Sequence, residues 1–316
     1  MVRMKDSNHI AIDINKEHKP QIPEMGGVGV VLSVSLTLTL IGGALVLFDI
    51  YEEPSILYAA LSVVFIASYI GLFDDISVIS RKNKAIGLLL AGLPLAVSRT
   101  FSTVIQIPFY GPTVFWDYQW QYLAFWLLIV PLGVFAAANA FNMSAGYNGL
   151  ESGQTAIIAF FLLLIAAFTK ANLMGMLILA STLGASLGLY VFNRYPAQTF
   201  VGDIGTLSMG ALIATGAIYT GLEFYAIICV APMFYEFFAT AYYKYKKIER
   251  RGLCHDPIIN GNNSLQPPKG AEHYTLCYFL LSRKAMTEKQ LVNKVLKLFT
   301  LSGLIALSLA LLNMII

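Results

Sequence analysis

The feature that most constrains this chain is a series of long segments with almost no charged side chains. A helix needs roughly 20 residues to cross about 30 Å of hydrocarbon. Candidate spans are Gly26–Phe48, Ile56–Phe73, Ala85–Ser98, Tyr122–Ala138, Gln154–Phe168, Asn172–Phe192, Thr206–Tyr219, Glu223–Tyr243 and Leu298–Ile316. Because helices satisfy their own backbone hydrogen bonds in lipid, the sequence predicts an all-α polytopic membrane protein with about nine transmembrane helices. They form a single transmembrane domain over residues 1–316.

Composition supports this class. Hydrophobic residues make up 57% of the chain and charged residues only 12%, whereas soluble domains carry about 25% charged residues. The third segment is short for a span, and the seventh and eighth segments are joined by a tight turn. Between the third and fourth segments, Ser102–Phe115 combines Pro and Gly with β-branched and aromatic residues, which favours a short β-hairpin.

The distribution of Lys and Arg predicts the orientation. If the N-terminus is cytosolic, the inner segments carry 19 of the 21 Lys and Arg residues, and only Arg99 and Lys170 lie outside. This asymmetry follows the positive-inside rule. The net charge of +3 therefore indicates membrane topology and does not suggest a nucleic-acid partner. Eleven of these cations lie in a long basic cytoplasmic loop, residues 244–297, which favours contact with anionic headgroups.

Polar residues gather in the inner loops, while the outer loops are short. The inner loops are GLFDDISVISRKNK at 71–84, NAFNMSAGYNGLESGQ at 139–154, NRYPAQTFVGDIG at 193–205 and the basic loop. Since all four face the same side of the membrane, their side chains can meet at one site on the cytoplasmic surface.

The adjacent carboxylates of Asp74 and Asp75 need an explanation, because like charges repel and a nearby bilayer adds a desolvation cost. A divalent cation, Lys84 or a shared proton would offset the repulsion; the alternative is a solvated helix end. Asp203 and Asn142 on the same face favour the first interpretation, since Mg²⁺ prefers oxygen ligands from one or two carboxylates and substrate phosphates.

The second inner loop has the composition of a ligand-binding turn. Its glycines, Gly146, Gly149 and Gly153, allow close backbone approach, and Asn148 can recognise a hydrogen-bonding edge. The alternative role for such small residues is helix packing in the membrane. Phe200, in the third loop, is either an aromatic interfacial anchor or a stacking surface for a base.

Four stretches together carry a resemblance to a known family. IPEMGG at 22–27, GLFDDISVISRKNK, NAFNMSAGYNGLESGQ and RYPAQTFVGD at 194–203 resemble the polyprenyl-phosphate N-acetylhexosamine-1-phosphate transferase superfamily. DINKEHKPQIPE looks most like the eukaryotic and archaeal dolichyl-phosphate GlcNAc-1-phosphotransferase branch. The resemblance implies transfer of GlcNAc-1-phosphate from UDP-GlcNAc to a polyprenyl phosphate of the dolichyl type, with release of UMP. This is the first membrane step of N-glycan-type lipid assembly for protein glycosylation.

The resemblance also assigns roles to individual residues. It implies Mg²⁺ (or Mn²⁺) held by Asp203 and Asn142, and uracil recognised by Asn148 and Phe200 with Glu24 beside the nucleotide. The lipid phosphate and the diphosphate are expected near Asp74, Asp75 and Lys84. In the basic loop, His255 with Arg250 and Arg251 is expected to recognise the sugar. The active site is expected on the cytoplasmic face of the plasma membrane in a prokaryote, or of the endoplasmic reticulum in a eukaryote.

Several points stay open at this level. Family members usually have ten transmembrane helices, and the first of them appears missing here. Another UDP-N-acetylhexosamine or undecaprenyl phosphate is an alternative substrate pair, and direct attack and a covalent aspartyl intermediate are alternative mechanisms. A transporter is a remote alternative, because transporters place polar residues at mid-membrane in paired repeats. The oligomeric state is open too, a homodimer included. Glu236, an acid inside the eighth segment, is a weaker functional candidate.

Overall fold

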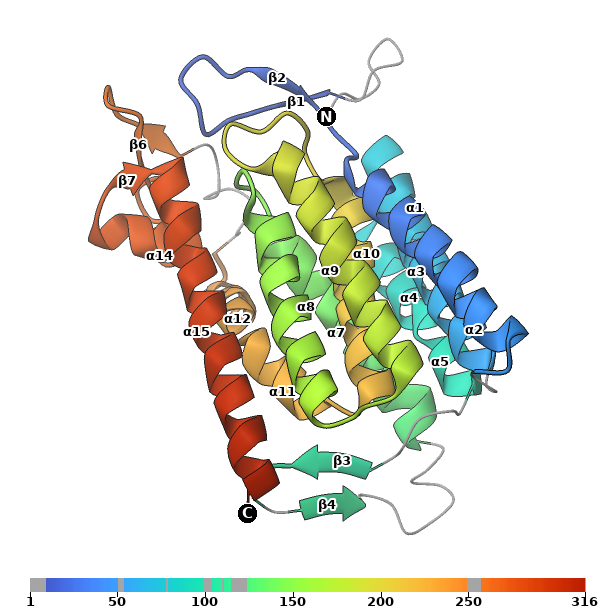
Figure 1. Cartoon of the computed structure of the whole chain (residues 1–316). Helices are drawn as coiled ribbons and strands as arrows, with labels where there is room; N and C mark the ends of the chain where they lie inside the picture. The colour runs from blue at the N-terminus through green and yellow to red at the C-terminus, as the bar shows by residue number, and fades with distance from the viewer. Residues whose placement is uncertain are drawn as a thin grey trace.

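The structure is a computed structural model that describes residues 10–50, 54–77, 79–98, 104–109, 111–114, 124–248 and 257–315. Within these residues the chain forms a helical bundle with small antiparallel sheets at both ends (Figure 1). The strands are β1 (Ile10–Ile12), β2 (Gln21–Pro23), β3 (Val104–Ile107), β4 (Gly111–Val114), β5 (Ile258–Ile259), β6 (Ser264–Gln266) and β7 (Met286–Thr287). We call the end that carries β1, β2 and β5–β7 the polar end; β3 and β4 lie at the opposite end and form the predicted hairpin.

The helices run mostly along the long axis of the bundle. They are α1 (Gly27–Thr37), η1 (Leu38–Gly42), α2 (Gly43–Leu47), α3 (Pro54–Ile76), α4 (Arg81–Ala91), α5 (Leu93–Ser98), η2 (Phe125–Ile129), α7 (Val130–Met143), α8 (Leu150–Phe168), α9 (Leu173–Asn193), α10 (Gly202–Thr220), α11 (Glu223–Cys229), η3 (Ala231–Met233), α12 (Phe234–Tyr245), α14 (Leu276–Arg283) and α15 (Glu288–Ile315). The predicted all-α membrane class is therefore confirmed.

The predicted count of nine transmembrane helices is not confirmed. By length and composition, six helical segments in the described residues can cross a membrane, or seven if a bent pair counts as one span. The bent pair is α11 with η3 and α12, whose axes differ by 60° around Pro232. The third predicted segment is broken into α4 and α5, which have 11 and 6 residues. The seventh predicted segment corresponds to α10. This helix is rich in Gly, Ser and Thr and is not among the helices whose length and hydropathy suit a membrane span.

Helix α10 forms the centre of the bundle. It packs against α1, α3, α7, α8 and α9, and nearly all of its residues from Ile204 to Thr220 are buried. A helix that is apolar or small on every side belongs in a core and cannot present a polar face to solvent. Gly221, in the left-handed conformation at φ 67°, ends α10 and provides the tight turn expected before α11. The N-terminus of α10 therefore points at the polar end from inside the bundle.

Close backbone contacts bring α1 and α3 against the start of α10. A Cβ atom added at Gly71 of α3 would lie 2.5 Å from the carbonyl oxygen of Asp203, and one at Gly27 of α1 would lie 2.2 Å from the Cα of Gly205. Side chains cannot occupy such gaps, so glycine is required at these two contacts. As a result, the side chains that follow Gly71 on α3 reach the first turn of α10.

The segment predicted as a long basic loop, residues 244–297, is largely folded where the structure describes it. It contains the three-stranded sheet of order β5–β6–β7, helix α14 and the first turns of α15. The backbone N–H of Leu276, at the start of α14, donates a hydrogen bond of 2.9 Å to Glu236 Oε1. Buried Glu236 thus links α12 to α14, which gives this acid a structural role.

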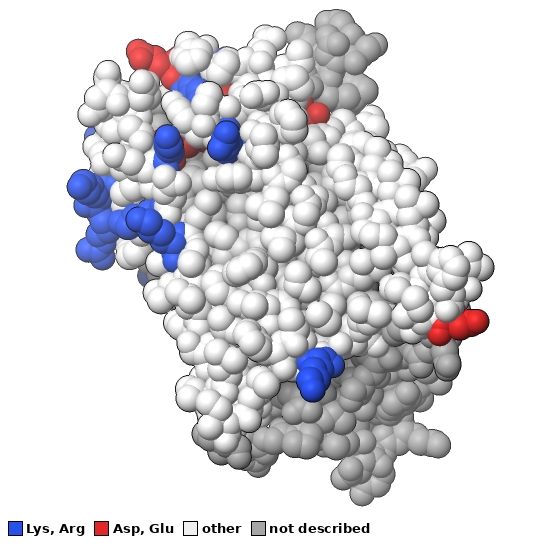
Figure 2. Space-filling view, in the orientation of Figure 1, with Lys and Arg blue, Asp and Glu red and all other residues white. Residues whose placement is uncertain are grey.

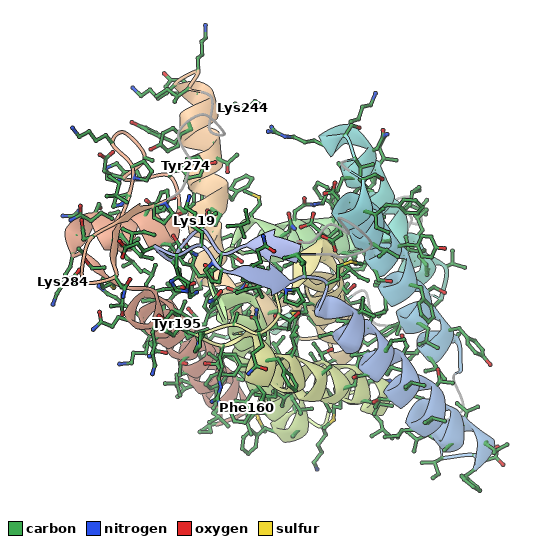
Figure 3. The ribbon with its side chains drawn as sticks, turned by 90° about the horizontal axis from the view of Figure 1, so that it is seen from above. Lys19, Phe160, Tyr195, Lys244, Tyr274 and Lys284 are labelled. Atoms are coloured by element: carbon green, nitrogen blue, oxygen red, sulfur yellow. The ribbon has the colours of Figure 1, made fainter. Side chains whose placement is uncertain are left out.

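Charge is distributed unevenly over the face shown in Figure 2. Lys and Arg gather at the upper left, over the polar end near α14 and α15, whereas the middle of the face is almost free of charged side chains. In the view from above, β1 and β2 lie over the middle of the bundle, with α14 on one side and α1 and α3 on the other (Figure 3). The apolar belt and the charged end agree with a bundle that spans a membrane.

Candidate active site

The ammonium group of Lys84 is the centre of a polar cluster at the polar end. Ser80 caps α4 by accepting a hydrogen bond from the N–H of Asn83, as N-cap serines do, and Lys84 follows in the first turn. Lys84 Nζ lies 2.8 Å from Asp74 Oδ2 and 2.5 Å from Asp203 Oδ2. It also lies 3.4 Å from Asn142 Oδ1. One cation therefore joins the ends of α3, α7 and α10.

Asp75 has a different environment from its neighbour Asp74. Its two carboxylate oxygens accept hydrogen bonds from the backbone N–H groups of Asp203, at 2.8 Å, and Ile204, at 3.0 Å. These are N–H groups of the first turn of α10, which have no partner within the helix. A carboxylate is also favoured there by the helix dipole. Asp75 thus caps α10 from a neighbouring helix and holds Asp203 in place.

Asn142, near the end of α7, orients the carboxylate of Asp203. Its Nδ2 donates to Asp203 Oδ1 at 2.6 Å and to Thr206 Oγ1 at 3.0 Å. Asp203 therefore has one oxygen held by an amide and the other by Lys84. The structure brings together five of the residues that the sequence predicted, namely Asp74, Asp75, Lys84, Asn142 and Asp203.

The electrostatics of the cluster are dominated by excess negative charge. Burial alone would lower the pKa of Lys84, but the charges and hydrogen bonds of Asp203 and Asp74 outweigh it and raise that pKa above its usual value. The pKa of Glu24, which precedes α1, is raised to about 8 by burial and by the negative charges of Asp75 and Asp203. Asp74 and Asp203 share one ammonium, and Asp75 and Glu24 add negative charge nearby, so this region favours a further cation.

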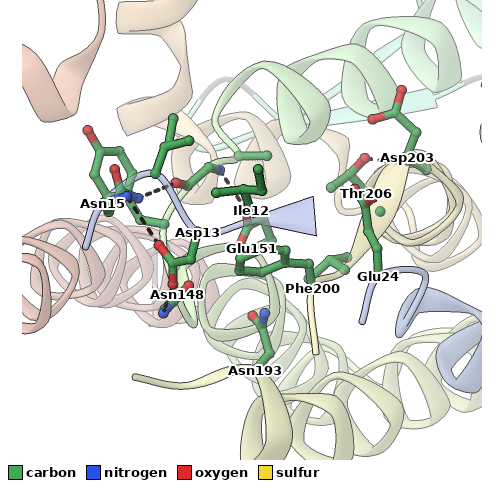
Figure 4. A pocket seen from close by; sticks show the side chains of 16 residues that line it. Ile12, Asp13, Asn15, Glu24, Asn148, Glu151, Asn193, Phe200, Asp203 and Thr206 are labelled. Atoms are coloured by element: carbon green, nitrogen blue, oxygen red, sulfur yellow. Dashed lines mark hydrogen bonds between the residues drawn. The ribbon is translucent and has the colours of Figure 1, made fainter. Parts of the chain in front are cut away.

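A pocket of about 250 Å³ extends from Asp203 toward β1 (Figure 4). Glu24, Thr206 and Asp203 lie at one end, which we call the acidic end. Asp13, Asn15 and Asn148 lie at the other, which we call the amide end, and Phe200 lies between the two. Phe200 is half-buried, and its backbone is fixed because its N–H donates to Pro23 and its carbonyl accepts from Gly26.

The glycine-rich loop between α7 and α8 forms one wall of the pocket. The N–H of Gly146 donates to Glu151 Oε1 at 2.6 Å, and its carbonyl accepts from Asn15 Nδ2 at 2.9 Å. Gly149 has φ 85°, a conformation that favours glycine, and its N–H donates to Asn193 Oδ1. The glycines thus place loop backbone against the pocket.

Sequence reasoning missed a buried ionic network beside the loop. Lys16, in the β1–β2 connection, pairs with Asp13 and, at 3.1 Å, with Glu288 at the start of α15. The side chains of these three residues are each at least nine-tenths buried. Apart from the short spacing from Asp13 to Lys16, nothing in the sequence pattern indicated this pairing, because charged residues in loops and at helix starts are usually solvated.

The remaining predicted residues divide into two groups. Glu24, Asn148 and Phe200 line the pocket together with Asp203. Arg250, Arg251 and His255, the predicted sugar-binding residues, lie outside the described residues.

The site contains suitable oxygen ligands for the expected divalent cation. Asp203 lines the pocket, the amide oxygen of Asn142 lies in the same cluster, 3.4 Å from Lys84 Nζ, and Mg²⁺ is commonly bound by few protein oxygens plus substrate phosphates. No group of three His, Cys, Asp or Glu residues suited to a metal occurs among the described residues.

Comparisons with known proteins match the chain to one family. A family model described as glycosyl transferase family 4 matches residues 57–221. A protein of Saccharolobus solfataricus, provisionally named UDP-N-acetylglucosamine–dolichyl-phosphate N-acetylglucosaminephosphotransferase, is 34% identical over 69% of this chain and 66% of its own length. A protein of Sulfolobus acidocaldarius with the same provisional name is 33% identical over 77% of this chain and 74% of its own. The phospho-N-acetylmuramoyl-pentapeptide-transferase of Bacillus subtilis is 33% identical over 72% and 70%.

Proposed function

The chain belongs to glycosyl transferase family 4, and we propose that it transfers GlcNAc-1-phosphate from UDP-GlcNAc to a dolichyl-type polyprenyl phosphate, releasing UMP. The observation that carries the proposal is the position of Lys84 between Asp74 and Asp203, next to a pocket with an acidic and an amide end. The names of the archaeal relatives supply the substrates. The cytoplasmic face is proposed as the location of the site, because most cations of the chain lie on that side of the predicted topology.

The proposed nucleotide position follows from the chemistry of the two pocket ends. The uracil occupies the amide end, where Asn148 offers hydrogen-bonding groups and Phe200 an aromatic face for stacking. The diphosphate lies at the acidic end beside Asp203 and Lys84. In this position the diphosphate is next to the end of α3 and the start of α4, where it can meet a lipid phosphate.

The reaction is a phosphoryl transfer with a balanced exchange of bonds. An anionic oxygen of the lipid phosphate attacks the phosphorus that carries the sugar, and the bond from that phosphorus to the UMP oxygen breaks. Catalysis of such transfers is mostly positioning and neutralisation of charge. Lys84 stays protonated because its pKa is raised, so it is suited to bring the two anionic substrates together.

The two aspartates of α3 have separate roles in this proposal. Asp74 accepts from the Lys84 ammonium at Oδ2 and from the N–H of Ile79 at Oδ1, so it positions Lys84 at the charged centre. Asp75 acts through α10, because both of its oxygens are engaged by backbone N–H groups. We therefore treat Asp75 as a positioning residue.

A divalent cation, Mg²⁺ or Mn²⁺, is part of the proposal. Asp203 and Asn142 would hold it, and it would neutralise charge on the diphosphate. The protein residues would keep their own tasks: Lys84 would bind phosphate oxygens, and Asp75 would fix the first turn of α10, which carries Asp203.

The test is to incubate membranes containing the protein with several UDP-sugars and polyprenyl phosphates, and to identify the lipid product by mass spectrometry. The expected product is a polyprenyl diphosphate carrying one GlcNAc, formed with UDP-GlcNAc and dolichyl-type lipid. EDTA should stop its formation and added Mg²⁺ or Mn²⁺ should restore it. Membranes with Asp203→Asn provide the control and should form almost none. A lipid product with no dependence on Asp203 would contradict the assignment of the site.

A second candidate within the family uses another UDP-N-acetylhexosamine or undecaprenyl phosphate. It is favoured by the Bacillus subtilis relative, whose identity to this chain is similar to that of the archaeal proteins. The same experiment separates the two, because the mass of the product identifies both sugar and lipid. Membership of a transferase family leaves the transporter alternative without support.

A further inference from the structure

The amide end of the pocket contains an unusually costly arrangement of buried charges. Asp13, Lys16 and Glu288 are 2%, 7% and 2% exposed. Burying an ion costs several kcal/mol unless its partners compensate. Here Lys16 contacts both carboxylates, and its ammonium also lies 4.9 Å from the centre of the Tyr195 ring. This network fixes the position of Asp13 at the edge of the pocket.

Asp13 in turn controls the side chain of Asn148. Its Oδ2 accepts hydrogen bonds from Lys16 Nζ and from Asn148 Nδ2, the latter at 3.0 Å, and its Oδ1 accepts from the N–H of Asn15 at 3.2 Å. A carboxylate in an ion pair offers only acceptors. Asn148 must therefore turn its NH₂ group toward Asp13, and its carbonyl group points elsewhere.

The rest of Asn148 is also held in place. Its backbone N–H donates to Glu288 Oε1 at 2.8 Å, so Glu288 fixes the main chain while Asp13 fixes the amide. None of the described residues donates to Asn148 Oδ1, and this oxygen is not sealed from solvent. Since Asn148 lines the pocket, its free acceptor is available to a ligand at the amide end (Figure 4).

A fixed acceptor distinguishes between the two pyrimidines. Uracil carries a donor, N3–H, where cytosine carries an acceptor, N3. We propose that Asp13 determines the base specificity of the pocket, because it sets the orientation of the Asn148 amide and so selects uracil over cytosine. Lys16 and Glu288 support Asp13 in this role. The inference rests on the proposed function, which places a uridine nucleotide in this pocket.

The test compares binding of UMP and CMP to the full chain, purified in detergent, by calorimetry. The wild type should bind UMP more tightly than CMP. In Asp13→Asn, the new amide can donate as well as accept, so Asn148 can turn its NH₂ group into the pocket and pair with cytosine N3. The ratio of the CMP to the UMP dissociation constant should then fall by at least about tenfold, the range expected for one mispaired buried hydrogen bond.

The matched control is Glu17→Gln, which removes the same charge from an exposed position in the same connection and should leave both affinities unchanged. If Asp13 had a purely structural role, Asp13→Asn would weaken the binding of UMP and of CMP equally. An unchanged ratio of the two dissociation constants overturns the inference.

If Asp13→Asn does not fold, measurements on the wild type still test the inference. The wild type should bind 3-methyluridine monophosphate, which lacks the N3 donor, at least about tenfold more weakly than UMP; equal binding of these two, or of UMP and CMP, overturns the inference. Failure of the wild type to bind UMP at all would instead contradict the proposed function.

Discussion

Asp74 and Asp75 show how a single step along a helix separates two tasks. Successive helical residues project about 100° apart, so the two carboxylates of α3 cannot face the same partner. Asp74 meets Lys84, and Asp75 meets the first turn of α10. The like charges are compatible because one is offset by an ammonium and the other by two backbone N–H groups and a helix dipole.

Replacing each aspartate should therefore reduce transfer for different reasons. Asp74→Asn should lower turnover at least about a hundredfold, because it weakens the contact with Lys84. Asp75→Asn should lower turnover by a similar factor, because it displaces Asp203. Asp75→Asn should also lower the melting temperature, because it loses part of a helix cap that contributes about 1 kcal/mol. Turnover assays and thermal unfolding in detergent measure both effects. Asp49→Asn, at an exposed residue of the opposite end, is the control. Near-normal activity in both variants of the pair would mean that the carboxylates form a solvated helix end.

Phe200 offers a second test at this scale. Phe200→Ala should weaken UMP binding by about 1–3 kcal/mol, the usual contribution of base stacking on an aromatic ring. Calorimetric titration with UMP measures the change. Phe160→Ala, at an exposed position on α8, removes the same ring far from the pocket and should not affect it. If Phe200→Ala bound UMP like the wild type, Phe200 would be an interfacial anchor.

At the scale of elements, the active centre depends on helices that touch backbone to backbone. The capping of α10 by Asp75 requires α3 to approach within the distance that Gly71 allows. Small residues permit such close helix contacts in membranes. The position of Asp203 is therefore set by the packing of α1, α3 and α10 together with its own hydrogen bonds.

Gly71→Ala should separate α3 from α10 and reduce turnover. The added methyl group would lie 2.5 Å from the backbone of Asp203 and Ile204, and a displacement of about 1 Å at a catalytic centre can cost about a hundredfold in rate. Gly133→Ala is the matched control, because a Cβ there has no atom within 4 Å. Turnover of the two variants, measured at equal amounts of folded protein, gives the comparison. Equal activity would show that the α3–α10 contact adapts without moving the site.

The sequence predicted which loops meet but could not predict how their side chains are arranged. Alternation of spans places the inner loops on one face, so the meeting of Asp74, Asn142, Lys84 and Asp203 followed from topology. The contact of Gly71 with α10 sets the rotation of α3 about its axis, and so decides where Asp74 and Asp75 point. A single glycine contact leaves no periodic pattern in the sequence. The break of the third segment into α4 and α5 lies beside Pro94, and the bend between α11 and α12 lies beside Pro232. Proline interrupts helices, but hydropathy does not register such breaks.

At the scale of the whole molecule, one end of the bundle carries all of the described chemistry. The polar end combines the ends of α3, α7 and α9 and the starts of α4, α8, α10 and α15. The ion pair from Lys16 to Glu288 was not predictable, because it joins residues 272 positions apart and resembles solvated loop charges in the sequence. Burial of such a pair is decided by the assembled bundle.

The predicted orientation can be tested by labelling in a prokaryotic host. In a Cys254→Ser background, Lys284→Cys and Lys170→Cys place single exposed thiols at the polar end and at the opposite end, while Cys229 and Cys277 are buried. A membrane-impermeant maleimide should label Lys170→Cys in intact cells and Lys284→Cys only after permeabilisation. The reverse pattern would place the active site outside the cytosol.

The contact between Lys16 and Glu288 has a consequence for the synthesis of the protein. A ribosome adds about 5–20 residues per second, so the N-terminal hairpin is made on the order of tens of seconds before its partner at the start of α15 leaves the exit tunnel. During that interval Lys16 has not yet met Glu288, and the glycine loop lacks one of its anchors. The pocket that Asp13 and Asn148 line is therefore completed only after the start of α15 has been made.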